Sequence, residues 1–300
     1  MPTGPDISIV IRTLNESRWL PKLLEAVVAQ DTSVSAHETI IVDSGSTDET
    51  LAIATRYNCR VVKIRKDEFT FGRSLNIGCS AAMGSKLVFI SGHCIPADPH
   101  WLRNLTAPLD QDIAYSYGRQ IGYETTKFSE RQVFAKYFPT SVIEAPGGFF
   151  CNNANAALRS DIWAKHPFDE ELTGLEDMEL AKRLLAEKLQ VRYVPEAPVF
   201  HIHDEPWQKI KLRYEREAIA LQKIMPEIQL TFGDFLRYLA GGILHDCSEA
   251  LNERRLLKLL PEIAMFRLMQ YWGSYQGNRD HTKLSRNRKE RYFYPKKSSK

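Results

Sequence analysis

The sequence predicts an α/β protein with a mainly parallel sheet that helices cover on both faces. Apolar, β-branched segments such as Ile7 to Ile11 alternate along the chain with segments whose apolar residues recur at helical spacing. Parallel strands need a crossover connection, usually a helix, so this alternation favours the architecture. From Trp207 onward only the helical pattern remains, which adds a helical appendage to the predicted sheet domain.

The first two pairs of strand and helix show the pattern most clearly. Ile7 to Ile11 is apolar on both sides, as expected of a strand buried on both faces, and leucines and valines at helical spacing follow it. The next segment, TIIVDSGSTDETLAIATRYN, predicts a buried strand that ends at Val42, then a turn and a helix. Ser46 is expected to open that helix, with Glu49 completing a capping box.

The later elements follow the same two patterns. The predicted strands cover residues 61–64, 86–90, 113–117, 191–194 and 197–200, and the predicted helices cover residues 74–83, 210–225, 231–251 and 256–271. The stretch APGGFFCNNANAALR, rich in Gly and Asn, predicts a loop that ends near residue 159.

We therefore divide the chain into a sheet domain (residues 1–206), a helical appendage (207–276) and a basic tail (277–300). The tail has nine Lys or Arg against two acidic residues, a net charge of +7, which leaves −4 on the rest of a chain whose total is +3. Such a tail, with aromatic residues at 292–294, suits an anionic membrane surface or a phosphate-bearing partner. A solvated, disordered terminus is the alternative.

The composition indicates the cellular compartment and the general class of protein. With 43% hydrophobic and 26% charged residues the chain has ordinary soluble usage, and no apolar run approaches the ~18–20 residues that span a bilayer. We expect a cytoplasmic protein that can also lie at the inner face of the membrane. The five cysteines are an odd number without CxxC spacing, which favours reduced thiols. Because basic character belongs to the tail, we expect no nucleic-acid partner.

Polar residues follow three of the predicted strands where each strand ends. These segments are Thr13 to Glu16, Asp43 to Ser46, and Ser91 to Cys94. Ligands bind open α/β sheets beyond the carboxyl ends of their strands, so the three segments are expected to converge on one crevice.

Four motifs in order resemble family 2 glycosyltransferases. SIVIRTLNES, IIVDSGSTDET, FGRSLNIGCSAAMGSKLVFI and GLEDMELAKRL lie between about residues 6 and 205. The resemblance implies the nucleotide-diphospho-sugar transferase (A-type) fold and inverting transfer of a sugar from a nucleotide diphosphate sugar. The helices after Trp207 are similar to the extension of bacterial members that build surface polysaccharides.

Asp43 is the first candidate for donor binding. A carboxylate at a strand end can accept the imide N–H of a pyrimidine, and the resemblance implies that this Asp contacts the base. Alternatively, Asp43 forms an Asx turn. The family often has a second acid where this chain has Ser44, which leaves open whether the base is uracil, thymine or guanine.

The other donor residues come from the same motifs. The resemblance places Thr13, Asn15 and Glu16 around base and ribose, although Asn15 or Ser17 would also serve as a helix cap. It directs Arg73 toward the diphosphate, whereas a solvent-facing helix arginine is the alternative. The complete predicted donor set is Thr13, Asn15, Glu16, Asp43, Ser44, Arg73, Asn76 and Ser91.

Glu176 and Asp177 are the candidates for catalysis. Both fall in the first turn of a predicted amphipathic helix, where the helix dipole favours any carboxylate. The resemblance makes the second acid, Asp177, the general base that deprotonates the acceptor hydroxyl in a single displacement. It also places Asn152, Asn153 and Glu176 near the donor sugar or the acceptor.

A diphosphate leaving group needs a cation or fixed donors to stabilise its charge. The family has Asp-x-Asp where this chain has Ser91, Gly92 and His93, so His93 takes the place of a ligand acid. His201 and His203 follow a later strand, and His93 with His201 or His203 predicts a site for a divalent cation, Mn²⁺ or Mg²⁺, of which a neutral imidazole suits Mn²⁺ better. Metal-free neutralisation by protonated histidine and Arg73, or a structural role for His93, are the alternatives.

The predicted function is an inverting glycosyltransferase that moves a hexose or deoxyhexose from a nucleotide diphosphate sugar to a saccharide or lipid-linked acceptor in surface polysaccharide assembly. The competing class is a nucleotide-sugar-binding module without turnover. A nucleotidyltransferase is a third class, but RTLNE is not the Gly-rich phosphate loop that it would need.

Overall fold

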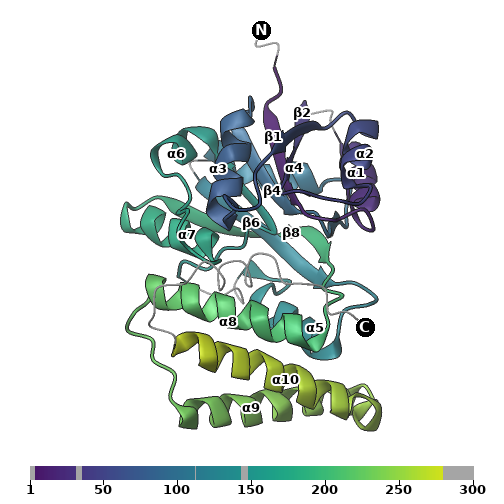
Figure 1. The fold of residues 1–300 in the computed structure, drawn as a ribbon, viewed down its shortest axis with the longest axis vertical. Helices are drawn as coiled ribbons and strands as arrows, with labels where there is room; N and C mark the ends of the chain where they lie inside the picture. Colours follow the sequence, from purple (N-terminus) through teal and green to yellow (C-terminus); the bar gives the residue numbers. More distant parts are fainter. Residues whose placement is uncertain (1–3, 32–35, 112, 143–147, 280–300) are drawn as a thin grey trace. The chain divides into compact units, whose positions relative to one another are not determined.

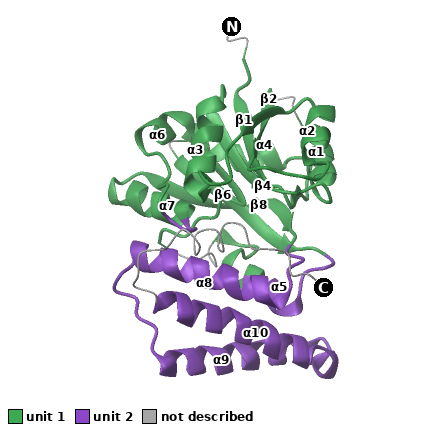
Figure 2. Ribbon diagram, viewed as in Figure 1, with its two compact units in different colours: residues 1–123, 134–171, 176–202 green, residues 124–133, 172–175, 203–300 purple. Residues whose placement is uncertain are grey.

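A computed structural model describes residues 4–31, 36–111, 113–142 and 148–279. The chain forms two compact units (Figure 2): the first comprises residues 1–123, 134–171 and 176–202, and the second comprises residues 124–133, 172–175 and 203–300. The second unit contains the helices predicted after Trp207. The division of the chain at residue 206 stays a prediction, and residues 280–300 of the predicted basic tail lie outside the described residues.

The first unit is built on an eight-stranded sheet in the order β3-β2-β1-β4-β7-β6-β8-β5. Six strands run the same way, whereas β7 is antiparallel to both of its neighbours and β5 is antiparallel to β8. The sheet is therefore mixed with a parallel majority, as predicted. Its strands are β1 (Ile7–Thr13), β2 (His37–Asp43), β3 (Arg60–Lys63), β4 (Lys86–Ser91), β5 (Cys94–Pro96), β6 (Ile113–Gly122), β7 (Asn155–Arg159) and β8 (Gln190–His201).

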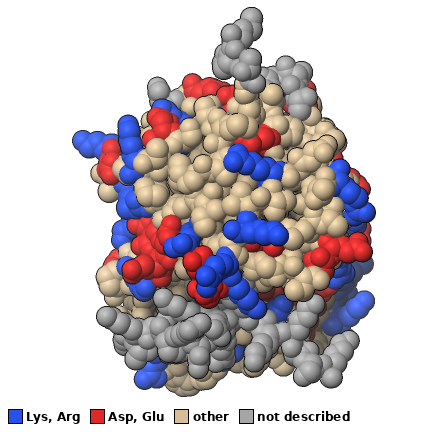
Figure 3. All heavy atoms as spheres, turned by 45° about the horizontal axis from the view of Figure 1, so that its top comes forward, with Lys and Arg blue, Asp and Glu red and all other residues tan. Residues whose placement is uncertain are grey.

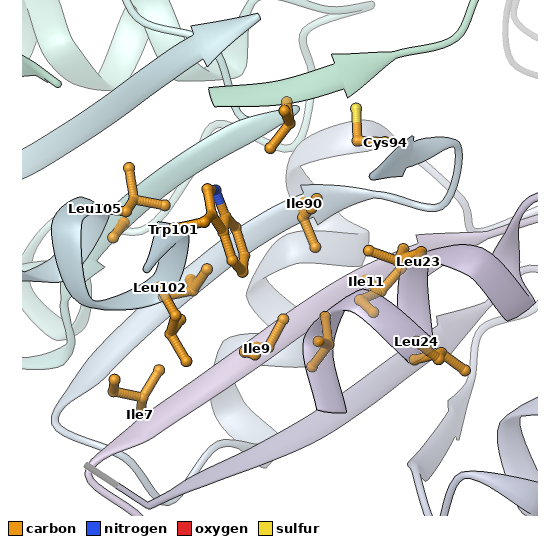
Figure 4. Packing of buried hydrophobic residues seen from close by; sticks show 14 of the residues in the cluster. Ile7, Ile9, Ile11, Leu23, Leu24, Ile90, Cys94, Trp101, Leu102 and Leu105 are labelled. Carbon is orange, nitrogen blue, oxygen red and sulfur yellow. The ribbon is translucent and has the colours of Figure 1, made fainter. Parts of the chain in front are cut away.

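Helices cover both faces of this sheet (Figure 1). Ile7, Ile9 and Ile11 of β1 point to one face, where they pack with apolar residues of α1, α2 and α4. Figure 4 shows Trp101 of α4 among these side chains, and Trp101 is fully buried. Val10 points to the other face and packs with residues of α3, α6 and α7. Alternation with period two thus buries β1 on both sides.

The helices of the first unit are short. They comprise α1 (Leu20–Val28), α2 (Thr50–Arg56), α3 (Phe71–Ala81), α4 (Trp101–Thr106), the 3₁₀ helix η1 (Ala107–Gln111), α6 (Ser160–Lys165) and α7 (Glu176–Ala186). A further helix, α5 (Phe128–Tyr137), contains the boundary between the two units.

Two local predictions were wrong for identifiable reasons. The capping box of Ser46 and Glu49 does not form, because the Ser46 hydroxyl donates to Asp43 and α2 begins four residues later at Thr50. The stretch expected to be a loop before residue 159 contains β7, whose residues 155–158 are buried and pair with β4. Asn155 and the small Ala156 and Ala157 mask the pattern of a strand.

The second unit contains three long helices, α8 (Trp207–Ile224), α9 (Phe232–Asn252) and α10 (Leu256–Asn278). Glycines let α10 approach α8 closely, since a Cβ at Gly273 would collide with the Lys211 carbonyl oxygen and one at Gly277 with that of Glu215. Between α9 and α10, Arg267 donates two hydrogen bonds to Asp246, at 2.7 and 2.6 Å, and both residues are buried. This bidentate pair fixes the register of the two helices.

The described residues show neither a helix that could span a membrane nor, on the visible face, a large patch of one charge. Among the described residues, no helix has both the length and the apolar content needed to cross a bilayer. On the face shown in Figure 3, the described Lys and Arg side chains are interspersed with Asp and Glu. This mixture agrees with the small net charge of residues 1–276.

We predict that Asp246→Ala lowers the free energy of unfolding by about 3–5 kcal/mol, because it leaves the Arg267 guanidinium buried without its carboxylate. The midpoint of urea unfolding, followed by circular dichroism, measures the change. Glu253→Ala is the matched control, since its ion pair with Arg255 is at the surface and is worth at most about 1 kcal/mol. Equal effects of the two substitutions would contradict the role assigned to the buried pair.

Candidate active site

The strand ends that the sequence singled out meet at one edge of the sheet. β1, β2 and β4 are parallel neighbours that end at Thr13, Asp43 and Ser91. β7 runs the opposite way, so its first residue, Asn155, pairs with Ile90 at this same edge. Polar loops from four strands therefore surround one region, as expected at the carboxyl edge of such a sheet.

Asp177 lies at this edge in the first turn of α7, with only 6% of its surface exposed. Its two carboxylate oxygens accept the backbone N–H groups of Asn153, at 2.7 Å, and of Met178, at 2.8 Å. Burial, followed by repulsion from Glu176, raises the pKa of Asp177 to about 7, although the two N–H donors and Arg12 act in the opposite direction. A carboxyl group with such a pKa can exchange a proton near neutral pH.

Glu176 is held by Arg12, the penultimate residue of β1. The Arg12 guanidinium donates to Glu176 at 3.0 Å and to the carbonyl oxygen of Phe71 at 3.2 Å, and it lies over the Phe71 ring. Only 4% of the Glu176 side chain is exposed. The pair thus ties the end of β1 to the first turn of α7, which also positions Asp177.

Two residues near the contact between Arg12 and Glu176 have strained backbone conformations. Among the described residues, Asn15 and Leu175 are two of five non-glycine residues with positive φ, both at 57°. Asn tolerates this conformation, whereas Leu pays roughly 1–2 kcal/mol for it. Leu175 directly precedes the two acids, and strain of this kind gathers at functional sites.

The carboxylate of Asp43 is 1% exposed and organises the loop that follows β2. Its Oδ1 accepts the hydroxyls of Thr13 and Ser46, and its Oδ2 accepts the backbone N–H groups of Gly45 and Ser46 at 2.9 and 3.0 Å. This is the turn-forming role that the sequence left open as an alternative. A nucleobase can bond to this carboxylate only if one of these donors yields, and the Ser46 hydroxyl can rotate away.

The loop after β1 joins the loop after β2 through Asn15, whose side-chain oxygen accepts the N–H of Thr47 at 2.8 Å. Glu16 donates its own backbone N–H to the Thr50 hydroxyl at 2.8 Å. Ser44 is buried, and its hydroxyl donates to the Thr13 carbonyl oxygen. These bonds preorganise the two loops, while donor contacts of Thr13, Asn15, Glu16, Ser44 and Ser91 stay predictions.

Arg73 and Asn76 of α3 have structural partners. Arg73 lies 3.7 Å from Glu170, and 43% of its side chain is exposed. The Asn76 amide donates to Phe168 and Glu170 and accepts from Trp163 and the Phe168 N–H. Asn76 therefore anchors the segment before α7, and the donor contacts predicted for Arg73 and Asn76 stay predictions.

His93 and His201 are brought together by β5 and β8. Their rings stack with centroids 5.3 Å apart, and a ring nitrogen of one lies within 4.8 Å of a ring nitrogen of the other. Nδ1 of His93 bonds to Glu16 at 2.9 Å, and Nδ1 of His201 bonds to the side-chain oxygen of Gln120 at 2.6 Å. Because these oxygens only accept, each Nδ1 carries a proton and the lone pair of the neutral ring lies on Nε2.

His203 belongs to the second unit, where its Nδ1 bonds to Glu130 at 2.7 Å. The same Glu130 oxygen accepts from Arg213, which also bonds to Glu205 at 2.9 Å. Although burial raises it, the positive charges of Arg213 and His203 lower the pKa of Glu130 to about 2. A carboxylate that stays ionised therefore orients the His203 ring.

The two predicted sugar contacts differ in their surroundings. The Asn152 side-chain oxygen accepts from Gln120 at 3.0 Å and from the Ala154 N–H at 3.0 Å. Asn153 is 2% exposed, and its side-chain oxygen accepts the Tyr115 hydroxyl. Within the part of the chain that the structure describes, the Asn153 amide nitrogen has no hydrogen-bond partner, which leaves a buried donor beside Asp177.

No role was predicted from the sequence for Arg12 or Gln120. An arginine inside the apolar run SIVIRT is a signal for Arg12, because a buried strand carries a charge only when a partner is present. Nothing in the sequence identifies Glu176 as that partner, 164 residues away.

A cavity of about 480 Å³ lies elsewhere in the first unit. Its lining includes His37 to Thr39 at the start of β2 and Tyr57 to Arg60 before β3, so it is at the amino edge of these strands. None of the acids and histidines described above lines it.

Two solved structures illustrate the proteins that share this fold. A mannosyltransferase from Pyrobaculum calidifontis, solved with GDP-Man and Mn²⁺, superposes with a TM-score of 0.59 at 14% identity, over 92% of this chain and 85% of that one. Glucosyl-3-phosphoglycerate synthase from Mycobacterium tuberculosis, solved with Mn²⁺, UDP and phosphoglyceric acid, gives 0.55 at 20% identity, over 74% and 78%. The fold is thus that of the A-type (GT-A) glycosyltransferases, as predicted.

Sequence comparison then gives the family. Residues 8–166, more than half of the chain, match the family described as "Glycosyl transferase family 2", and the chain belongs to that family. It is 26% identical over 251 residues to the O-antigen chain rhamnosyltransferase RfbN of Salmonella typhimurium, covering 79% of this chain and 77% of the relative. WbaN of Salmonella anatum, another O-antigen chain rhamnosyltransferase, is 26% identical over 252 residues, with the same coverage. The protein is a glycosyltransferase, as predicted.

We predict that Asp177→Asn gains stability relative to wild type as pH rises from about 4 to 8, by about 1–3 kcal/mol in the free energy of unfolding. The folded-state pKa of Asp177 is raised, so the wild-type carboxyl lowers stability progressively as pH rises from about 4 to 7, whereas the amide does not titrate. The Asn amide nitrogen also faces one of the two backbone N–H donors, a cost that is the same at every pH. Urea unfolding at several pH values measures the difference, and a difference that does not change with pH would contradict the assignment.

Proposed function

We propose that this enzyme inverts the anomeric centre, with Asp177 as the general base that takes the proton of the acceptor hydroxyl. The observation that carries the proposal is the buried position of Asp177 at the carboxyl edge of the sheet, with a pKa near neutrality. A base with a pKa near the operating pH is half ionised there and still strong enough to accept a proton in the transition state. One carboxylate suffices for a single displacement.

The residues around Asp177 supply its orientation. The N–H groups of Asn153 and Met178 fix the two carboxylate oxygens, and Arg12 neutralises the adjacent Glu176. The Asn153 amide nitrogen is the nearby donor that a sugar hydroxyl can satisfy. We therefore propose that Asn153 contacts the sugar. Asn152 and Gln120 support the loop through the hydrogen bond between their side chains.

We propose that the donor is a nucleoside diphosphate sugar held by the loops after β1 and β2. Asp43 supports this role through the loop it organises, and it takes a nucleobase N–H directly when the Ser46 hydroxyl turns away. The two Salmonella relatives are rhamnosyltransferases by name, which supports an activated deoxyhexose as the donor and a polysaccharide precursor, saccharide or lipid-linked, as the acceptor.

We propose that His93 and His201 hold a divalent cation against the donor diphosphate. Both rings carry their lone pair on Nε2, and Glu16 and Gln120 hold the opposite nitrogen, an arrangement that orients histidine ligands. Imidazole ligands favour Mn²⁺ over Mg²⁺. The cation would offset the charge that develops on the leaving diphosphate. His203 follows His201 by two residues in the chain. The Cα atoms of these two histidines therefore lie within roughly 7 Å of each other, whatever else surrounds His203.

The metal-free alternative has weaker support. It requires Arg73 to neutralise the diphosphate, yet Arg73 is paired with Glu170.

For location, we propose the cytoplasm, with contact at the inner membrane face where a lipid-linked acceptor would lie. The basic tail suggested for this contact extends beyond the described residues.

We predict that Asp177→Asn lowers kcat for sugar transfer at least about 10³-fold without changing the Kd of the donor, because the substitution removes the base and keeps the side-chain volume. A panel of uridine, thymidine and guanosine diphosphate sugars that includes activated rhamnose, assayed with Mn²⁺, measures both quantities. Asp161→Asn is the matched control, an acid in the first turn of α6.

Two results would count against this proposal. Transfer that survives in Asp177→Asn would remove Asp177 as the base. A wild-type protein that binds nucleotide yet releases none from any donor would instead support the binding module without turnover.

We predict that His201→Ala weakens Mn²⁺ binding at least about tenfold in the presence of a nucleoside diphosphate, because it removes an oriented imidazole ligand. Calorimetric titration of Mn²⁺ into the protein measures the affinity. His245→Ala on α9 is the control, since 64% of that side chain is exposed and it lies in the second unit. Unchanged Mn²⁺ affinity in the His201 variant would favour neutralisation of the diphosphate without metal.

A further inference from the structure

Exposed apolar side chains concentrate on α9 and α10. Of the thirteen large apolar residues that are exposed in the described chain, nine lie on these two helices. On α9, Leu236, Leu244 and Leu251 recur at intervals of eight and seven residues, which places them on one stripe of the helix. The opposite side of α9 already packs on α10 through Phe235 and Ala250. A helix that is apolar on both sides has a second apolar environment to meet.

The connection between α9 and α10 presents the most exposed of these residues. Leu257 is 90% exposed, Leu251 is 62% exposed and Leu260 is 42% exposed. Leaving such side chains in water forgoes the free energy of burial, so their clustering at one turn indicates an interaction surface. We define the hairpin tip by six exposed residues, which are Leu251, Arg254, Arg255, Leu257, Lys258 and Leu260.

Arg254 reinforces this interpretation through its backbone. It has φ of 57° and follows the C-terminal cap of α9, where its N–H donates to the Leu251 carbonyl oxygen at 2.8 Å. Glycine is the usual residue in this position because the left-handed conformation costs other residues roughly 1 kcal/mol. An arginine here places a cation at the tip despite that cost.

The charged residues at the hairpin tip indicate which kind of surface the tip binds. Arg254, Arg255 and Lys258 are exposed among the leucines, and the one acid of residues 251–260, Glu253, pairs with Arg255 at 3.1 Å. Residues 251–260 therefore have a net charge of +2, three basic residues against one acid. A second copy of the chain would bring like charges together across a two-fold axis. An anionic lipid surface complements both features, since its headgroup phosphates bind the cations and its acyl boundary accepts the leucines.

We propose that the hairpin tip seats the enzyme on an anionic bilayer. Leu251, Leu257 and Leu260 enter the interface, while the basic side chains extend along them to the headgroup phosphates. The apolar stripe of α9 continues from the tip along the same interface. This inference deepens the proposed function, because a lipid-linked acceptor resides in a bilayer, but the binding itself requires no sugar transfer.

The test is sedimentation of the full chain with vesicles of phosphatidylcholine, with and without phosphatidylglycerol. We expect the wild-type chain to bind the anionic vesicles and to bind neutral ones at least about tenfold more weakly. Leu251→Ser with Leu257→Ser, and separately Arg254→Gln with Lys258→Gln, should each weaken anionic binding at least about tenfold. Val28→Ser and Met83→Ser are matched controls, since both residues are exposed apolar residues of the first unit.

Two outcomes would overturn the proposal. Binding that is equal in the tip variants and the wild type would show that another segment meets the lipid. A wild-type dimer in sedimentation velocity that the leucine variants convert to monomers, without vesicle binding, would assign the tip to self-association. Donor hydrolysis in lipid-free buffer, measured for every variant, separates this result from a failure of the proposed function, because the tip variants should keep the wild-type rate.

Discussion

The ion pair between Arg12 and Glu176 holds together the part of the molecule where the chemistry is expected. It joins residues 164 positions apart, the end of the first strand and the first turn of α7. Both partners are largely removed from solvent, so each charge is stabilised by the other. Without Arg12, two adjacent carboxylates would share a buried turn with only backbone donors to stabilise them. The placement of Asp177 therefore depends on an arginine that itself does not touch Asp177 through a hydrogen bond.

At the carboxyl edge of the sheet, some contacts hold the loops in place, whereas other groups can change their hydrogen-bond partner. The loop after β2 is fastened to the Asp43 carboxylate by the backbone N–H groups of Gly45 and Ser46, and the loop after β1 is fastened to the loop after β2 by Asn15. By contrast, the Ser46 hydroxyl can rotate away from Asp43, and the buried Asn153 amide nitrogen has no hydrogen-bond partner among the described residues. Preorganised loops that leave a few adaptable donors are what tight, specific sugar binding requires.

The sequence alone predicted the elements whose pattern is set by burial. β1 and β2 have apolar residues on both faces, and α9 begins at the expected position because Thr231 and Asp234 form a capping box. The box predicted at Ser46 failed because its hydroxyl donates instead to the carboxylate of Asp43 three residues earlier. β7 was missed because Asn155 and two alanines give no alternation, and only pairing with β4 and β6 makes that segment a strand.

The candidate site shows the same limit. Residues on strand ends, such as Asp43 and His93, could be located because topology brings strand ends together. The contacts of Asn76 with Phe168 and of Arg73 with Glu170 could not be predicted, since these partners lie about ninety residues further on. Long-range pairing of polar side chains leaves no periodic trace in a single chain. Motif resemblance identifies positions, whereas the structure identifies what each position bonds to.

The discontinuous course of the second unit has a consequence for how this protein is made. Glu130 enters that unit early in the chain, yet its partners His203 and Arg213 are synthesised more than seventy residues later, and Glu262, which accepts the Phe128 N–H, later still. The ribosome must therefore release nearly the whole polypeptide before these contacts can form. A fragment that begins at residue 203 would also keep Glu205 beside Arg213 but lose Glu130, so the helical part lacks one of the two carboxylate partners of Arg213 when it is separated from the preceding chain.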